Sequence, residues 1–244
     1  MVGNEKVPFE GLIRKLERLA KLDEEDREAL ASLRFSTETI NEDRHLVREG
    51  DEPSDCAVLV AGHACRYKSL SSGGRQIVSF HLPGDMLDAE QLLLSRADHS
   101  IQAITDVIVA WVPTVDLKKV VRERPAIADA LWRDCLIDAS VFREWVLNVG
   151  QRDPRSRIAH MLCEFAARRQ AAGLGPPEGA ALPMSQERIA DATGLTSVHV
   201  NRMLHALMTQ GVIALDGRHV QIIDWNGLRT IAEFDPGYLH AVAA

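Results

Sequence analysis

The pattern of apolar and polar positions divides the chain into three regions. The N-terminal stretch carries Leu12, Leu16 and Leu19 at helical spacing, which predicts a short amphipathic helix. Between residues 34 and 113, short runs rich in Val, Ile and Phe alternate with Gly, Pro and Asp turns, as in HLVREGDEP and SSGGRQIVSFHLPGD. Regularly spaced short strands of this kind predict an antiparallel β-sandwich or barrel.

The middle region, AIADALWRDCLIDASVFREWVLNVGQR, has no Pro and no Gly before Gly150, which predicts one long helix. Its apolar residues extend beyond a single stripe, so both sides of the helix must be covered. One side can pack on the β domain, and a second copy of the helix can cover the other. A central helix buried within one chain is the alternative. The predicted dimer interface consists of Ile127, Leu131, Cys135, Phe142 and Val149.

The C-terminal region predicts a helix-turn-helix with a wing. The Asp-Pro pair at 153–154 is a start signal for a helix over 154–171. The segment SQERIADATGLTSVHVNRMLHALMTQG then contains two helical patterns separated by Gly194, with Ser185 and Thr196 placed as caps. The following VIALDGRHVQII has two apolar runs around an Asp-Gly turn, which predicts a β-hairpin.

The outward face of the second helix carries side chains that can read DNA. An Arg at the start of a major-groove helix can contact guanine, an Asn can read adenine, and an aliphatic group can touch a thymine methyl. Arg202, Asn201 and Val198 supply these groups. Small polar side chains near helix N-termini suit phosphates. The predicted DNA-binding residues are Ser185, Gln186, Thr196, Ser197, Val198, His199, Asn201, Arg202 and, at the wing tip, Arg218.

Composition is ordinary for a soluble globular protein, at 46% apolar and 26% charged residues. No apolar run approaches the roughly 18 residues of a membrane helix, and the N-terminus is too charged for a secretory signal. We therefore expect a cytoplasmic protein with no membrane partner.

Net charge is −7, which at first argues against nucleic acid. Between residues 151 and 229, however, nine Arg and Lys stand against seven Asp and Glu, and the remainder holds 19 basic and 28 acidic residues. The acidity therefore lies in the N-terminal part and the tail, and the local balance between residues 151 and 229 permits DNA binding.

Neither cofactor nor catalysis is predicted. The four cysteines form no CxxC pair, so inert buried thiols are expected, with a Cys56–Cys65 redox pair as the alternative. No nucleophile–base pair or metal cluster has useful spacing, which argues against an enzyme.

The chain resembles the Crp/Fnr family of bacterial transcription regulators over nearly its whole length. The matching segments are SQERIADATGLTSVHVNRMLHAL, PRSRIAHML, VREGDEPSDCAVLVAGHACRY, GGRQIVSFHLPGDML and SIQAITD. The resemblance implies an α+β fold with an N-terminal cyclic-nucleotide-binding-like β-roll (a double-stranded β-helix) at 1–124, a dimerisation helix and hinge at 125–152, and a winged helix-turn-helix at 153–244. It further implies a homodimer on palindromic DNA, with RNA polymerase as a partner. Ser197 and Val198 depart from the Arg-Glu pair of the cyclic-AMP branch, which implies a different half-site.

The signal that the sensor domain receives stays open. The candidate effector pocket comprises Gly84, Asp85, Met86, His99 and Ser100. A cyclic-AMP binder of this family needs Gly-Glu-Leu and a following Arg-Ser, and the absent Arg removes a charge-assisted phosphate contact. No Cys precedes Cys56, which argues against the iron–sulfur branch.

Three further interpretations of the signal remain. Haem would have to use the scattered His45, His63, His81 or His99, and a lone His is more often structural. The domain could also hold an unidentified small ligand, or none.

The rival function is a small-molecule or redox-responsive binding module whose winged helix mediates protein contacts.

Overall fold

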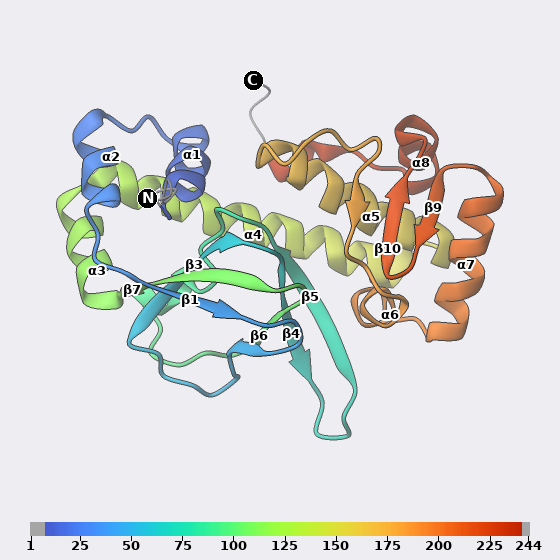
Figure 1. Cartoon of the computed structure of the whole chain (residues 1–244), viewed down its shortest axis with the longest axis horizontal. Coiled ribbons are helices and arrows are strands. Elements are labelled where there is room, and N and C mark those ends of the chain that lie inside the picture. The colour runs from blue at the N-terminus through green and yellow to red at the C-terminus, as the bar shows by residue number, and fades with distance from the viewer. Residues whose placement is uncertain (1–7, 241–244) are drawn as a thin grey trace, which may run out of the picture. The chain divides into compact units, whose positions relative to one another are not determined.

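The computed structural model describes residues 8–240, which form two compact units (Figure 1). Among the described residues, the first unit contains 8–66 and 80–138, and the second contains 67–79 and 139–240. The division therefore falls within the long helix, whereas the sequence predicts boundaries at 124 and 152. The predicted α+β class, with a β-rich N-terminal part, a long helix and a C-terminal helix-turn-helix, is confirmed.

Two small sheets form the β-roll, which belongs to the first unit except for residues 67–79 of β4, β5 and the turn between them. The strand orders are β1-β7-β3 and β2-β6-β4-β5, and β7 pairs antiparallel with both β1 and β3. Apolar side chains of the roll, among them Leu59, Ile101 and Val109, are fully buried. The strands are β1 (Ser36–Ile40), β2 (His45–Val47), β3 (Asp55–Ala61), β4 (Ala64–Ser69), β5 (Arg75–His81), β6 (Ser100–Ala103) and β7 (Val107–Pro113).

Helices cover the β-roll and form a second core. Leu12 and Leu16 are buried as their spacing predicts, and they pack in one cluster with Val58, Val112 and Leu117. The 3₁₀ turn η1 lies between β5 and β6. The bounds are α1 (Glu10–Leu19), α2 (Glu24–Ala31), η1 (Ala89–Leu92), α3 (Thr114–Glu123) and α4 (Pro125–Gln151).

The long helix α4 corrects part of the predicted dimer interface. Ile127 and Leu131 are buried in the same core as α1, so the chain itself covers them. Cys135 and Phe142 are exposed and Val149 is half-buried, so the chain itself leaves these three predicted positions at least partly uncovered. The error arose because an apolar helix has two buried faces, and sequence alone does not say which face packs internally.

A different set of apolar residues is exposed on α4. Trp132 is 58% exposed, Leu136 62% and Val146 70%. Together with Ala139 these positions are spaced by four, three and seven residues, which places them on one side of the helix. We call Trp132, Cys135, Leu136, Ala139, Phe142 and Val146 the α4 stripe.

The second unit contains the predicted winged helix. The predicted helix over 154–171 is confirmed, with Asp153 as its N-cap, and it packs against α6, α7 and α8. The predicted hairpin is confirmed as well, with a short third strand, β8, on its outer side. The elements are α5 (Pro154–Ala171), β8 (Ala181–Leu182), α6 (Gln186–Thr193), α7 (Ser197–Thr209), β9 (Ile213–Asp216), β10 (His219–Ile222), α8 (Trp225–Ala232) and η2 (Pro236–Leu239).

Side chains brace the bend between α4 and α5. Arg152 donates to Glu144 at 2.6 Å, and Asn148 donates to the carbonyl of Arg157 at 3.2 Å. Arg157 in turn donates to the carbonyl of Arg152 at 3.0 Å. The segment predicted as a hinge is therefore cross-linked by polar contacts within the second unit.

Candidate nucleic-acid interface

The two helices of the helix-turn-helix begin and end at the predicted residues. Ser185 caps α6 by accepting from the N–H of Arg188 at 3.2 Å, and Thr196 caps α7 by accepting from the N–H of His199 at 3.3 Å. Gly194 ends α6 in the left-handed region with φ of 66°, where Gly carries no Cβ penalty. Local side-chain chemistry thus sets both helix starts and the turn between them.

A fully buried apolar face fixes α7 on the domain. Val200, Leu204 and Leu207 are each 0% exposed, and they recur at the spacing of one helix face. On the opposite face Arg202 is exposed and Val198 is 70% exposed, and Ser197 is exposed at the first position of the helix. An aliphatic residue left this exposed beside polar neighbours indicates a contact surface.

Four other predicted DNA-binding residues have internal roles as well. The hydroxyl oxygen of Thr196 is the α7 cap, and that of Ser185 is the α6 cap. The amide of Asn201 donates to the side-chain oxygen of Gln186 at 3.3 Å, which joins α7 to α6. These residues therefore hold the surface in shape in addition to lying on it.

Two donors that the sequence did not reveal hold the C-terminal end of α6. Gln76 of β5 donates to the carbonyl of Ala192 at 3.0 Å, and Arg157 of α5 donates to the carbonyl of Thr193 at 3.0 Å. The last carbonyls of a helix lack partners within the helix, so these bonds satisfy groups that would otherwise need water. Gln76 lies 116 positions before its partner, and no local signal marks it.

The wing projects its turn into solvent. Asp216 pairs with His219 across the hairpin, and Gly217 adopts φ of 57° at the turn. Arg218 and His219 are exposed there, as predicted for side chains beside a groove. The strand β9 that leads into this turn packs on α7, so the wing is joined to α7 at its base.

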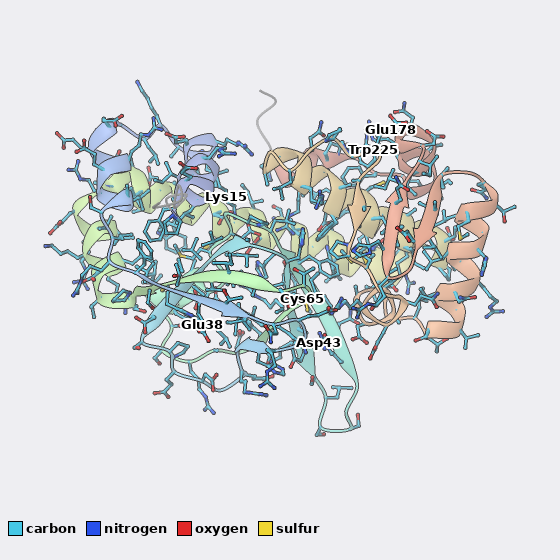
Figure 2. The ribbon with its side chains drawn as sticks, viewed as in Figure 1. Lys15, Glu38, Asp43, Cys65, Glu178 and Trp225 are labelled. Atoms are coloured by element: carbon cyan, nitrogen blue, oxygen red, sulfur yellow. The ribbon has the colours of Figure 1, made fainter. Side chains whose placement is uncertain are left out.

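The candidate effector turn in the first unit is buried beneath α1. Gly84 has φ of 96°, and a Cβ added there would lie 2.8 Å from the carbonyl of Gly11. Lys15 of α1 (Figure 2) donates to Asp85 at 2.9 Å and to Asp134 of α4 at 2.7 Å. Burial alone would lower the pKa of Lys15, but the carboxylates of Asp134 and Asp85 raise it above its usual value.

The remaining effector candidates have other partners. The hydroxyl of Ser100 accepts from the N–H of Glu49 at 2.9 Å, and His99 lies 2.6 Å from Asp98 and 3.2 Å from Glu90. Burial lowers the pKa of His99. The predicted pocket residues Asp85, His99 and Ser100 thus form contacts within the chain.

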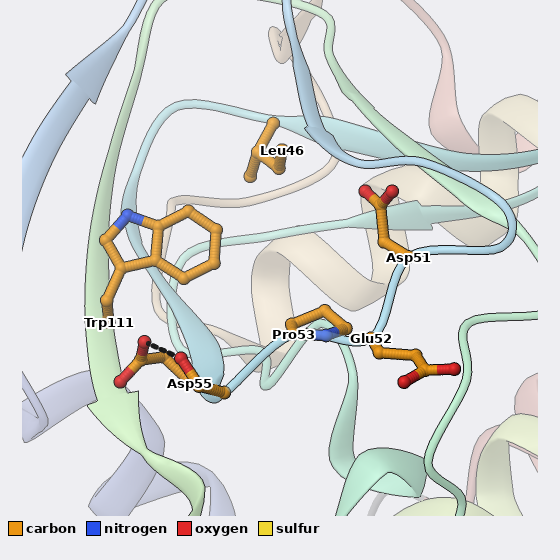
Figure 3. Close-up of a pocket in the computed structure, with 7 residues that line it drawn as sticks. Leu46, Asp51, Glu52, Pro53, Asp55 and Trp111 are labelled. Atoms are coloured by element: carbon orange, nitrogen blue, oxygen red, sulfur yellow. Dashed lines mark hydrogen bonds between the residues drawn. The ribbon is translucent and has the colours of Figure 1, made fainter.

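The structure outlines a hollow elsewhere on the first unit. It has a volume of about 440 Å³, and Figure 3 shows Trp111 beside Leu46, with Asp51, Glu52 and Pro53 across from them. A second hollow, of about 310 Å³, shares Trp111 and Leu46. Neither includes a predicted effector residue.

Three of the four cysteines are buried, as the sequence predicts. Cys56, Cys65 and Cys163 are buried and free, whereas Cys135 is exposed, which corrects the expectation of four buried thiols. Burial raises the pKa of Cys56 to about 12, which suppresses thiolate formation.

The structure also bears on metals and membranes. Within residues 8–240, no three His, Cys, Asp or Glu side chains are grouped to hold a metal ion. None of the helices in the described part of the chain has the length and apolar composition needed to cross a bilayer.

Known proteins share both parts of this architecture. Residues 37–124 match the cyclic nucleotide-binding domain, and residues 156–231 match the Crp-like helix-turn-helix domain. The transcriptional activator protein FnrL of Cereibacter sphaeroides is 28% identical over 210 residues, which cover 84% of each chain. The nitrogen fixation regulation protein FixK of Rhizobium meliloti is 31% identical over 191 residues, covering 77% of this chain and 83% of that protein.

A solved structure agrees with these matches. The structure of FixK2 from Bradyrhizobium japonicum has a TM-score of 0.73 and 29% identity, and it covers 82% of this chain and 98% of that one. A β-roll, a long helix and a Crp-like helix-turn-helix define a DNA-binding regulator of transcription rather than an enzyme. The chain belongs to the Crp/Fnr family, which confirms the resemblance.

Proposed function

We propose that the protein is a homodimer that reads a palindromic operator with α7 and the wing. The observation that carries the proposal is the exposed surface of α7, where Arg202 and Val198 lie opposite the buried Val200 and Leu204 and Ser197 is exposed at the helix start. A helix fixed on one face and polar at its exposed start can enter a major groove. In this proposal Arg202 contacts guanine, and Val198 contacts a thymine methyl.

Two recognition helices of a dimer would lie about 34 Å apart, one turn of the duplex. The remaining predicted contacts, to phosphates, come from the α6 and α7 N-termini and from Arg218. RNA polymerase is the further partner that we propose for a regulator of this family.

Substitution of Arg202 tests the reading face. We expect Arg202→Ala to weaken specific binding by about 1–3 kcal/mol, because a bidentate base contact is lost. Gel-shift titration on an operator selected from random DNA measures this. Arg133→Ala is the control, since it removes one exposed cation from α4 without touching α7. Equal affinities of the wild type and Arg202→Ala would contradict the assignment.

The α4 stripe is the proposed dimer contact. It supplies the large exposed apolar side chains that a helix–helix interface needs. Val146→Glu would place a charge in that interface, so we expect the dimer to dissociate and operator binding to fall with it. Sedimentation velocity gives the mass of the assembly. Arg133→Glu is the control, because Arg133 is an exposed residue of α4 that lies outside the α4 stripe. A Val146→Glu protein that stays dimeric would refute the proposed contact.

The sensor is proposed to work without cyclic AMP. Asp85 is engaged by Lys15, and the position expected for a phosphate-binding Arg holds His99, whose pKa burial lowers. A cyclic phosphate therefore meets no free cation at the predicted residues. Equilibrium dialysis with labelled cyclic AMP should show no saturable binding, and saturable binding would overturn this part.

The rival module, whose winged helix contacts only proteins, predicts a different salt response. Neutralised phosphates release counterions, so a DNA-binding dimer should lose affinity steeply as salt rises from 50 to 200 mM. A flat response would favour the rival.

A further inference from the structure

The hydrogen bond between Gln186 and Asn201 crosses from the first helix of the helix-turn-helix to the second. The Nδ2 of Asn201 lies 3.3 Å from the Oε1 of Gln186, and both side chains are half-buried. Both residues belong to short helices whose starts are capped and whose inner faces are buried. The two backbones are therefore fixed, and the bond restrains two side chains that would otherwise rotate.

The bond leaves a defined set of groups on Asn201. A side-chain amide has two N–H donors and one carbonyl acceptor. Gln186 accepts one N–H of Asn201, so one N–H and the Oδ1 acceptor stay available. Adenine presents an N7 acceptor and an N6 donor in the major groove, whereas guanine presents two acceptors there. The restrained Asn201 is complementary to adenine and not to guanine.

We propose that Gln186 is a positioning residue for base selection, acting through Asn201. It holds the Asn201 amide in the orientation that reads adenine, and so sets one base of each half-site without touching that base. This inference rests on the proposed function, because it assumes that α7 enters the major groove. This role differs from a phosphate contact, which is the role that a polar side chain at a helix N-terminus otherwise suggests for Gln186.

A phosphate role and a positioning role differ in what they change. Loss of a phosphate contact weakens binding to all sequences alike and lowers the salt slope. Loss of a positioning contact leaves average affinity nearly unchanged and lowers the preference for one base. The measurement that separates the two roles is the base preference at each operator position, obtained by selection from random DNA and confirmed by titration on single-base variants.

Three variants of Gln186 and its neighbours make the test sharp. Gln186→Met keeps the unbranched shape and removes the acceptor, so we expect the adenine preference at one position to fall about tenfold. Gln186→Glu keeps an acceptor for Asn201, so the preference should persist while added negative charge weakens binding to all sequences. Glu187→Gln, at the exposed neighbour, is the control and should change no preference.

A double-variant cycle completes the test. If Gln186 acts through Asn201, Gln186→Met should have no further effect on that preference once Asn201→Ala is present. Uniform weakening by Gln186→Met with an intact adenine preference would overturn the inference and leave the proposed function standing. Selection of guanine at the position that Asn201→Ala affects would also overturn it. A wild-type protein that enriches no sequence would overturn both.

Discussion

Polar side chains are buried in the candidate effector turn of the first unit (Gly84, Asp85 and Met86, called the sensor turn below) and exposed on α7, the proposed recognition helix of the second unit. Asp85 is buried and bound by Lys15, whereas Arg202 and Ser197 are exposed on α7. Ligand surfaces keep polar groups available to an outside partner, and buried polar groups must find partners within the chain. The contrast indicates that the α7 face is organised for an external ligand and that the described sensor turn is organised around its own N-terminal helix.

The same contrast extends to how each region is held. Lys15, Asp85 and Asp134 lie on three elements far apart in sequence, with separations of 70 and 119 positions. The caps at Ser185 and Thr196 join residues three positions apart. The turn at Asp85 thus adds long-range ion pairs to a local bond from the N–H of Leu82 to Asp85 at 2.9 Å, whereas the start of α7 is held by a local cap over a buried apolar face.

The largest effect should come from removing the ammonium of Lys15. Lys15→Met leaves two buried carboxylates without their shared cation, and breaking a buried pair in this way costs about 3–5 kcal/mol. Denaturant unfolding of the first unit should show this loss of unfolding free energy. The loss should become smaller as pH falls, because the two carboxylates then take up protons. Lys21→Met, at an exposed position, is the control. A Lys15→Met protein as stable as that control would show that the ion pairs do not hold the turn.

The two regions also differ in how far their contacts could be predicted. The caps, the Gly194 turn and the hairpin at Gly217 follow from residues within a few positions of one another, and all were predicted. The bonds Lys15–Asp134 and Gln76–Ala192 depend on the folded arrangement of distant segments, and no spacing rule marks them. The error at Ile127 has the same origin, because α4 is apolar on two sides and only the packed core selects the inner one.

A second prediction concerns the buried carboxyl of Asp88 beside the sensor turn. Burial raises its pKa to about 7, against the hydrogen bond that its carboxylate accepts from Ala57 N–H. The folded chain therefore holds this proton between about pH 4 and 7 while the unfolded chain releases it, so stability falls as pH rises through that window. Each pKa unit corresponds to about 1.4 kcal/mol, which bounds the effect near 4 kcal/mol.

Asp88→Asn isolates this contribution. The amide oxygen can still accept from Ala57, and it does not titrate. The variant should gain stability relative to the wild type as pH rises from 4 to 8, measured by denaturant unfolding at each pH. Parallel stability curves for the two proteins would contradict the raised pKa, and would remove one of the differences between the sensor turn and the exposed α7 face.

The smallest expected effect comes from removing the local cap at the start of α7. Thr196→Ala removes the side chain that accepts from the N–H of His199 at the start of α7, and loss of such a cap costs about 1 kcal/mol. Thr196→Ser keeps the hydroxyl and should restore most of that stability.

Because Val200, Leu204 and Leu207 still anchor the helix, only its first turn should fray, and that turn carries Ser197 and Val198. Hydrogen exchange should therefore quicken at the amides of His199 and Val200, which donate to Thr196, and stay unchanged at residues 204–207. Faster exchange along the whole helix would mean that the cap supports more than the first turn, and that the recognition helix is less firmly held by its apolar face than its burial indicates.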